Sequence, residues 1–188
     1  MSRKYKFRGN DELYFTTQTI VHWIDVLTRT EYKNIILDSL KHCQEKKGLE
    51  LYAWVIMTNH MHMVVGTNKN PLKDIMRDFK SYSSRKIREA IVANPKESRK
   101  EWMVSMLEHA GIMNPNNNDW QLWQQDNHPV HLYDGKITKQ KVNYIHNNPV
   151  RAGFVAEPQH WIYSSAGDYL ENRRGLIDIN ILDGLYHI

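Results

Sequence analysis

The stretch Asn-His-Met-His-Met-Val-Val at residues 59–65 joins two histidines to the start of an apolar run. The preceding run at residues 51–57, Leu-Tyr-Ala-Trp-Val-Ile-Met, is also apolar and rich in strand-forming residues. A tight turn between the runs would make them a β-hairpin. Side chains at i and i+2 of a strand share a face, so His60 and His62 are expected to point the same way, with Met61 in the opposite layer.

Two imidazoles fixed side by side on a strand supply two ligands for one divalent ion. A pair of hydrogen-bonded structural histidines in a sheet would show the same pattern. The triplet leaves both interpretations open, so the rest of the chain has to decide between them.

The segments around the hairpin alternate between strand and helix patterns. Residues 13–21 are rich in β-branched and aromatic residues and predict a first strand. Residues 30–47 predict a helix that stops at Gly48. A second helix is expected to open at Pro71, since proline suits the first helical turn.

The C-terminal half gives further elements. They are a short helix at 101–110, a fourth strand at 120–125, an extended segment at 128–132, a helix at 136–147 and a last helix at about 165–172. Pro149 is expected to end the long helix, because the residue before a proline is pushed out of the helical region. Ser164 and Ser165 are expected to cap the last helix.

The order β-α-β-β-α-β-α predicts an α+β fold, with a ferredoxin-like (split β-α-β) antiparallel sheet and packed helices. In that topology the strand with the histidines is central, which is a rigid place for a metal site. The length of 188 residues predicts a single domain over 1–188. Within it we expect an insertion at about 93–118 and a C-terminal tail at about 173–188 that packs back.

Composition is that of a globular protein, with 41% hydrophobic and 24% charged residues. No apolar run approaches membrane-spanning length, so no membrane association is expected. The basic segment 1–8 has no apolar stretch behind it and does not resemble a secretory signal. The single cysteine, Cys43, excludes an internal disulfide and a multi-cysteine zinc site. A cytoplasmic location is expected.

The net charge of +4 is unevenly distributed. Residues 1–8 contain four cations and no acid, and residues 73–88 contain six cations against two acids. Aromatic residues are interleaved with both groups, and Phe79 and Tyr82 are candidates for stacking on bases. Cations that neutralise phosphates and rings that stack on bases predict nucleic-acid binding. A solvated helix face remains the alternative.

Tyr144 and Asn148 fall on one face of the predicted helix at 136–147 and its C-terminal end. They offer a phenol and, one turn away, a carbonyl oxygen. Such an oxygen is a fair third ligand for Mg²⁺ or Mn²⁺ already held by two histidines. A packing tyrosine and a helix-ending asparagine form the alternative.

Three motifs together resemble a known family. They are His-Met-His at 60–62, Tyr-Ile-His-Asn-Asn-Pro-Val-Arg-Ala-Gly at 144–153 and Trp-Ile-Tyr-Ser-Ser-Ala at 161–166. The combination resembles the single-tyrosine HUH transposases, and within them the REP-associated tyrosine transposases of the IS200-like branch. The resemblance runs from about Tyr14 to Tyr169 and is weak over 93–118.

The resemblance implies a metal-dependent single-strand DNA endonuclease and strand transferase. His60, His62 and Asn148 would bind a divalent ion, Mg²⁺ or Mn²⁺, and Tyr144 would be the nucleophile that forms a 5′-phosphotyrosine. Many members have Gln at the position of Asn148, and the shorter side chain would need a closer helix or a bridging water. The implied partner is single-stranded DNA with hairpins, in the bacterial cytoplasm at the nucleoid. A homodimer is possible, with the site completed in cis or in trans.

The residues expected to bind DNA are chosen by charge. They are Arg3, Lys4, Lys6, Arg8, Lys80, Arg85 and Lys86. His146, His128 and His131 are extra imidazoles. We expect His146 to point away from Tyr144, and the other two to be surface residues near the end of the fourth strand.

A catalytically retired protein that binds DNA hairpins without cutting them is the main competing function. Two other classes lack their signatures. The two-histidine phosphoesterases need two HxT or HxS motifs, and the zinc enzymes of the HExxH type need that helical pattern. Neither pattern occurs in this chain.

Overall fold

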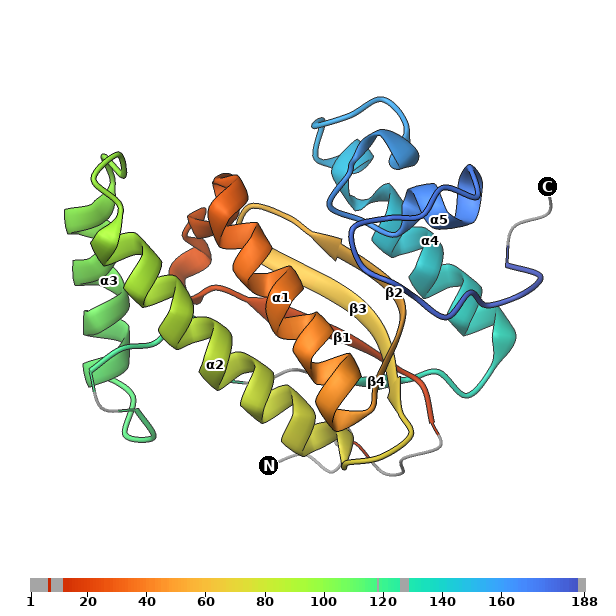
Figure 1. The fold of residues 1–188 in the computed structure, drawn as a ribbon, viewed down its shortest axis with the longest axis horizontal. Helices are drawn as coiled ribbons and strands as arrows, with labels where there is room; N and C mark the ends of the chain where they lie inside the picture. Colours follow the sequence, from red (N-terminus) through yellow and green to blue (C-terminus); the bar gives the residue numbers. More distant parts are fainter. Residues whose placement is uncertain (1–6, 8–11, 118, 126–128, 186–188) are drawn as a thin grey trace.

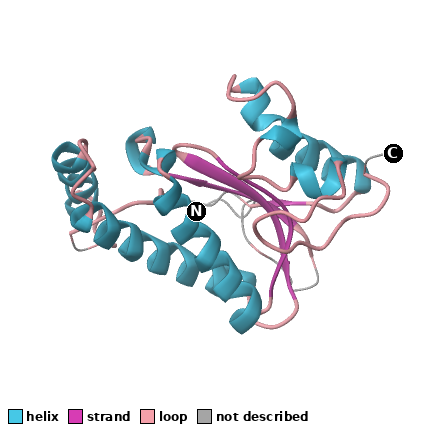
Figure 2. Cartoon of the chain, turned by 45° about the horizontal axis from the view of Figure 1, so that its top comes forward, coloured by secondary structure: helices cyan, strands magenta, loops and turns pink. Residues whose placement is uncertain are grey.

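The computed structural model describes residues 7, 12–117, 119–125 and 129–185, and these form an antiparallel sheet with helices on both faces (Figures 1 and 2). The strands are β1 (Tyr14–Thr19), β2 (Leu49–Ile56), β3 (His60–Thr67) and β4 (Val130–His131). The α-helices are α1 (Thr30–Lys47), α2 (Leu72–Ala93), α3 (Lys100–Ile112), α4 (Gly135–Arg151) and α5 (Ala166–Leu170). Short 3-10 helices are η1 (Val21–Trp23), η2 (Val26–Thr28) and η3 (Pro158–His160).

The strand order β2-β3-β1-β4 is the ferredoxin-like order, which confirms the predicted fold class. β3 pairs antiparallel with both β1 and β2 and is therefore an inner strand. Thr17 on β1 and Val55 on β2 lie opposite His62. Hydrogen bonds on both sides thus fix the backbone that displays the histidines.

The prediction of a fourth strand at 120–125 is wrong. The fourth strand is β4, which pairs with the first two residues of β1, and Trp123 makes only an isolated bridge to Ile20. The indole N–H groups of Trp120 and Trp123 donate to Ser84 and Ser83 on α2. Because these two bonds hold the segment against α2, it crosses to that helix instead of continuing along β1.

α1 and α2 cover one face of the sheet, where the main core lies. The strand residues on that face include Met61, Met63 and Val65, all fully buried. Gly48 ends α1 in the left-handed conformation, with φ of 77°, which glycine adopts without a steric penalty. Pro71 stands immediately before α2, as the sequence predicted.

α4 covers the opposite face and packs Val142 and Ile145 on Val55 and Val64. The prediction that Pro149 ends this helix is wrong, because α4 continues to Arg151 with the proline inside it. Proline removes its own N–H donor, and its ring crowds the carbonyl of the preceding turn, but neither effect prevents the next hydrogen bonds. Beyond it, the Ala152 and Phe154 N–H groups still donate to the carbonyls of Asn148 and Pro149. Asn148 therefore remains on the helix, one turn after Tyr144.

The segment after α2 forms α3, slightly longer than the helix predicted at 101–110. Gly111 on this helix lies directly against the backbone of residues 119–120, where an added Cβ would stand 2.2 Å from the Trp120 nitrogen. The division of the chain into one domain with an insertion at 93–118 stays a prediction.

The C-terminal part returns along the outer edge of β2. The N–H of Ile56 donates to the Tyr163 carbonyl, and that of Ser165 donates to the Trp54 carbonyl. The last helix is shorter than predicted, and the Ser165 side chain does not cap it. That hydroxyl is used inside the core, where it accepts from the Trp54 N–H. In the described part of the tail, the Asn180 N–H donates to the Leu51 carbonyl.

No helix among the described residues is both long enough and apolar enough to cross a bilayer.

Candidate metal and tyrosine site

His60 and His62 lie on the face of β3 that α4 covers, with their ring centroids 4.9 Å apart. Met61 between them is buried in the opposite layer, in the core beneath α1 and α2. The strand alternation predicted from the sequence therefore holds in the structure.

Each histidine is held through its Nδ1 atom. His60 Nδ1 lies 2.7 Å from Asn59 Oδ1, and His62 Nδ1 lies 2.8 Å from Thr17 Oγ1. The Asn59 amide nitrogen donates to Asp25 Oδ1, so its oxygen is the atom that faces His60. His60 must then donate from Nδ1, which leaves the lone pair on Nε2. Partners of this kind orient the histidines of metal sites.

Burial favours the neutral form of both rings. Burial, with smaller contributions from the charges of His60 and Lys141, lowers the pKa of His62 to about 3. Burial also lowers the pKa of His60, against opposing effects of a hydrogen bond with Asn148 and the charge of Asp25. Neutral imidazoles at pH 7 have a free nitrogen lone pair, which is the form that binds metal ions.

Tyr144 lies beside these rings in the same chain. Its ring centroid is 5.1 Å from that of His62 and 6.0 Å from that of Phe15, and the residue is 37% exposed. Asn148, one turn along α4, is within hydrogen-bonding reach of His60. The structure thus brings together the four residues chosen from the sequence, and it does so within one subunit.

Two cations next to the tyrosine were not selected from the sequence. Lys141 Nζ and Arg151 Cζ each lie 6.0 Å from the centroid of the Tyr144 ring. They stand three residues before and seven residues after the tyrosine on α4, which is the spacing of one helix face. That spacing could have identified them. Phe15, also missed, stacks on His62 at 5.2 Å.

The extra histidines lie elsewhere. His146 is fully buried, and its Nε2 lies 2.8 Å from Ser165 Oγ, on the side of α4 away from Tyr144. Burial lowers the pKa of His146 to about 3. His131 on β4 faces Glu12 at 3.5 Å, and His128 lies outside the described residues.

Among the residues that the structure describes, no group of three or more His, Cys, Asp or Glu side chains could hold a metal ion. Beside the two histidines, the polar side chain of Asn148 lies within hydrogen-bonding reach of His60.

The cations predicted to bind DNA differ in the contacts that their side chains make. Arg3, Lys4, Lys6 and Arg8 lie outside the described residues. Lys80 Nζ donates to the backbone carbonyls of Gln124 and Gln125, and Lys86 pairs with Glu89 at 2.7 Å. Arg85 is exposed, with its guanidinium 5.6 Å from the centroid of the Tyr82 ring.

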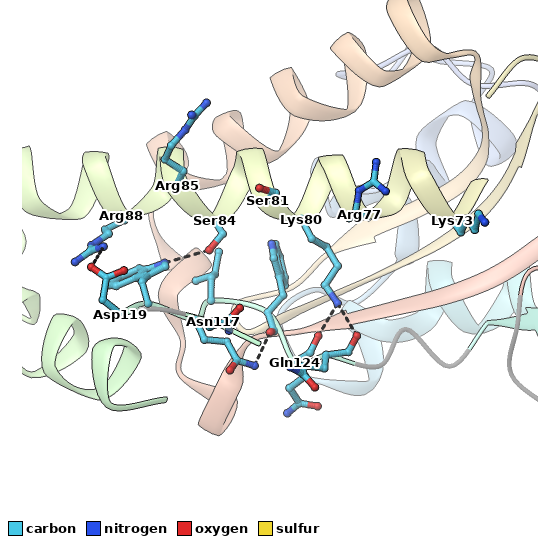
Figure 3. Close-up of a pocket in the computed structure, with 15 residues that line it drawn as sticks. Lys73, Arg77, Lys80, Ser81, Ser84, Arg85, Arg88, Asn117, Asp119 and Gln124 are labelled. Atoms are coloured by element: carbon cyan, nitrogen blue, oxygen red, sulfur yellow. Dashed lines mark hydrogen bonds and ion pairs between the residues drawn. The ribbon is translucent and has the colours of Figure 1, made fainter. Parts of the chain in front are cut away.

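A cleft of about 690 Å³ lies between α2 and the segment 117–125 (Figure 3). Two of the arginines on its α2 wall are neutralised by acids. Arg77 pairs with Asp74 and Asp78, and Arg88 pairs with Glu108 and Asp119. Of the described cations lining the cleft, Lys73 and Arg85 form no ion pair and are exposed.

The two aromatic candidates on α2 differ in exposure. Phe79 is only 1% exposed and belongs to the core, so it is not available to stack on a base. Tyr82 is 45% exposed and close to the cleft residue Arg85.

Comparison with known proteins agrees with this architecture. A solved structure described as "Structure of the REP associates tyrosine transposase bound to a REP hairpin" shares 19% sequence identity, covers 100% of this chain and 95% of its own, and gives a TM-score of 0.64. A putative transposase from Deinococcus radiodurans R1 also shares 19% identity and covers 79% of this chain and 95% of its own. Its TM-score of 0.44 is too low to bear on the fold. No curated protein matches the sequence.

The family described as "Transposase IS200 like" matches residues 22–106. The matched region contains both histidines and ends before α4, so it does not include Tyr144. Over these residues the chain is similar to the IS200-like transposase family, the family that the sequence motifs predicted.

Proposed function

We propose that this protein is a metal-dependent transposase that cuts and rejoins single-stranded DNA next to hairpins, with Tyr144 as the nucleophile. The observation that carries the proposal is the contact between the Tyr144 and His62 rings, at 5.1 Å within one chain. A tyrosine used only for packing would be buried, whereas this one is 37% exposed and flanked by two cations.

His60, His62 and Asn148 are the residues that would hold a divalent cation, Mg²⁺ or Mn²⁺, through the two Nε2 atoms and the amide oxygen. The two rings fit this role because they are neutral at pH 7 and are already oriented through Nδ1. A bound cation would polarise a phosphodiester and neutralise charge on its oxygens.

Tyr144 supplies the covalent step. Its hydroxyl oxygen forms a bond to phosphorus as the phenol proton passes to solvent, and the bond from phosphorus to the 3′ oxygen breaks. The leaving oxygen takes up a proton and becomes a free 3′-hydroxyl, while the 5′ end stays on the enzyme as a phosphotyrosine. A 3′-hydroxyl from another strand can reverse the step, because the phosphotyrosine conserves the phosphodiester bond energy.

Lys141 and Arg151 flank the phenol and would stabilise the negative charge that develops on the phenolate and the phosphate. Their positive side chains also attract the DNA backbone to this face of α4. Because all of these residues belong to one chain, the site can be completed in cis. A homodimer remains a prediction.

The cleft along α2 is our candidate for the surface that binds the hairpin. Lys73 and Arg85 line the cleft and supply exposed positive charge. Tyr82 does not line it, but its exposed ring lies next to the Arg85 guanidinium. The similar solved structure is described as bound to a REP hairpin, which supports hairpin DNA as the partner. With DNA as its partner, the protein would act at the bacterial nucleoid.

A covalent adduct separates this function from that of a retired hairpin-binding protein. Wild type is incubated with labelled hairpin oligonucleotides that carry a randomised single-stranded flank, with and without Mn²⁺. We expect a protein–DNA species that survives denaturation, requires Mn²⁺ and is lost in Tyr144→Phe. Tyr133→Phe, which alters a more exposed tyrosine of the same chain, should leave the adduct intact.

An adduct that persists in Tyr144→Phe would show that another residue is the nucleophile. Hairpin binding by wild type without any adduct, in Mg²⁺ or Mn²⁺, would favour the retired binding protein.

A further inference from the structure

Trp23 is an exposed aromatic residue at the end of the histidine row opposite Tyr144. Its ring centroid lies 5.8 Å from that of His60, and the residue is 58% exposed. His60 in turn contacts His62, and His62 contacts Tyr144. A large indole that stays in water beside a catalytic site needs a reason, because burial of its ring would be favourable.

The backbone that presents this ring is strained. His22 and Trp23 both have φ of 56°, a conformation that L-residues with large side chains rarely adopt. Backbone strain of this kind persists only where surrounding contacts impose it, and strained residues are enriched at functional sites. The strain here is therefore a second sign that the position of Trp23 is used.

Hydrogen bonds to the Trp23 backbone hold the strained segment in place. The Trp23 N–H donates to the Ile20 carbonyl, and the Asn59 amide nitrogen donates to the Trp23 carbonyl at 3.3 Å. The oxygen of the same amide accepts from His60. Asn59 thus fixes the position of Trp23 relative to the first histidine before any DNA arrives.

We propose that Trp23 is the stacking platform for an unpaired base next to the scissile phosphate. This inference rests on the proposed function of the site and adds a residue that positions the substrate. Single-stranded DNA binds to many proteins through bases stacked on aromatic rings, with little dependence on sequence because every base has a π-face. With a phosphate held between the histidines and Tyr144, the strand continuing past His60 would place a base on the indole.

The test is a double-mutant cycle that combines a substitution of Trp23 with a change in the DNA. Equilibrium binding is measured in a Tyr144→Phe background so that no DNA is cut. The probe is a hairpin oligonucleotide with an oligothymidine flank, in which each flank position in turn is made abasic. Trp23→Gly removes the ring and also relieves the strain at positive φ, so this variant should fold. Trp23→Phe keeps a smaller ring.

We expect Trp23→Gly to weaken binding to the intact flank by about 5- to 150-fold, the range known for loss of a stacked base, and Trp23→Phe to weaken it less. In the protein that keeps Trp23, one abasic position of the flank should weaken binding by a similar factor. In Trp23→Gly, the same abasic position should not weaken binding any further. Trp102→Ala, which removes a comparably exposed indole on α3, should leave binding unchanged.

Three results would overturn the inference. They are unchanged binding in Trp23→Gly, abasic penalties that are the same with and without the indole, and a loss of Mn²⁺ affinity in Trp23→Gly, which would mean that the ring only supports His60. The binding cycle does not depend on cleavage. A wild type that forms no adduct but gives the expected cycle would refute the nuclease function and leave the stacking role standing.

Discussion

Glu97 is predicted to be a major source of stability, through a buried carboxylate shared by two arginines. Its side chain is fully buried and accepts hydrogen bonds from Arg29 Nε at 2.7 Å, Arg99 Nε at 2.9 Å and the Tyr32 hydroxyl at 3.2 Å. Glu97→Gln removes the charge and turns an amide N–H toward an arginine donor. Removing one member of a buried ion pair costs about 3–5 kcal/mol.

We expect a loss near the lower end, about 3 kcal/mol, because the side chains of Arg29 and Arg99 are 33% and 26% exposed and can be partly resolvated. Urea unfolding at pH 7, followed by circular dichroism, measures this loss. Glu101→Gln, at an exposed position on α3, is the matched control and should change stability by less than about 0.5 kcal/mol.

The pH dependence gives a second check. The hydrogen bonds from Arg99, and after them those from Arg29, lower the pKa of Glu97 to about 2, while burial opposes them. A carboxyl group with a depressed folded pKa stabilises the protein above its unfolded pKa, about 4.3, and loses that contribution as pH falls through its folded pKa. The gap between wild type and Glu97→Gln should therefore narrow from about pH 5 to about pH 2. A gap that is absent at pH 7, or constant over this range, would refute the reasoning.

Three further predictions concern other parts of the molecule. Gly111→Ala would place a Cβ 2.2 Å from the Trp120 nitrogen and should cost about 1–3 kcal/mol in thermal unfolding, whereas Gly135→Ala, with nothing within 4 Å, should not destabilise. Lys141→Gln should slow adduct formation by about 10- to 100-fold, the equivalent of one lost charge-assisted contact, in a single-turnover assay; an unchanged rate would exclude its role. Burial raises the pKa of Cys43 to about 11, so iodoacetamide at pH 8 should label it only after unfolding, as read by mass spectrometry.

The fold and the central pair of histidines could be predicted because they depend on local patterns. Alternation of apolar residues identifies the hairpin of β2 and β3, and Gly48 and Pro71 mark helix ends with simple steric rules. The third strand is central in the common topology, so the histidines could be assigned to it without knowledge of side-chain packing.

The errors arose where tertiary contacts outweigh local preference. Residues 120–125 look like a strand, but their tryptophans bond to serines on α2, which cannot be known without the fold. Pro149 looks like a helix end, but α4 continues past it because the carbonyls of Asn148 and Pro149 still receive donors. Charge alone also could not show that the Lys80 ammonium donates to the backbone carbonyls of Gln124 and Gln125, and its role in DNA binding stays a prediction.

The stretch with the weakest sequence signal is physically connected to the candidate site. Glu97 holds Arg99, and Arg99 Nη1 donates to the Asp25 carbonyl at 2.7 Å. The Asp25 side chain accepts from the Asn59 amide, and the oxygen of that amide orients His60. The connection between α2 and α3 therefore braces the turn that positions a candidate metal ligand. None of these polar contacts is visible in hydrophobic periodicity, which explains how a segment expected only to be an insertion can support the site.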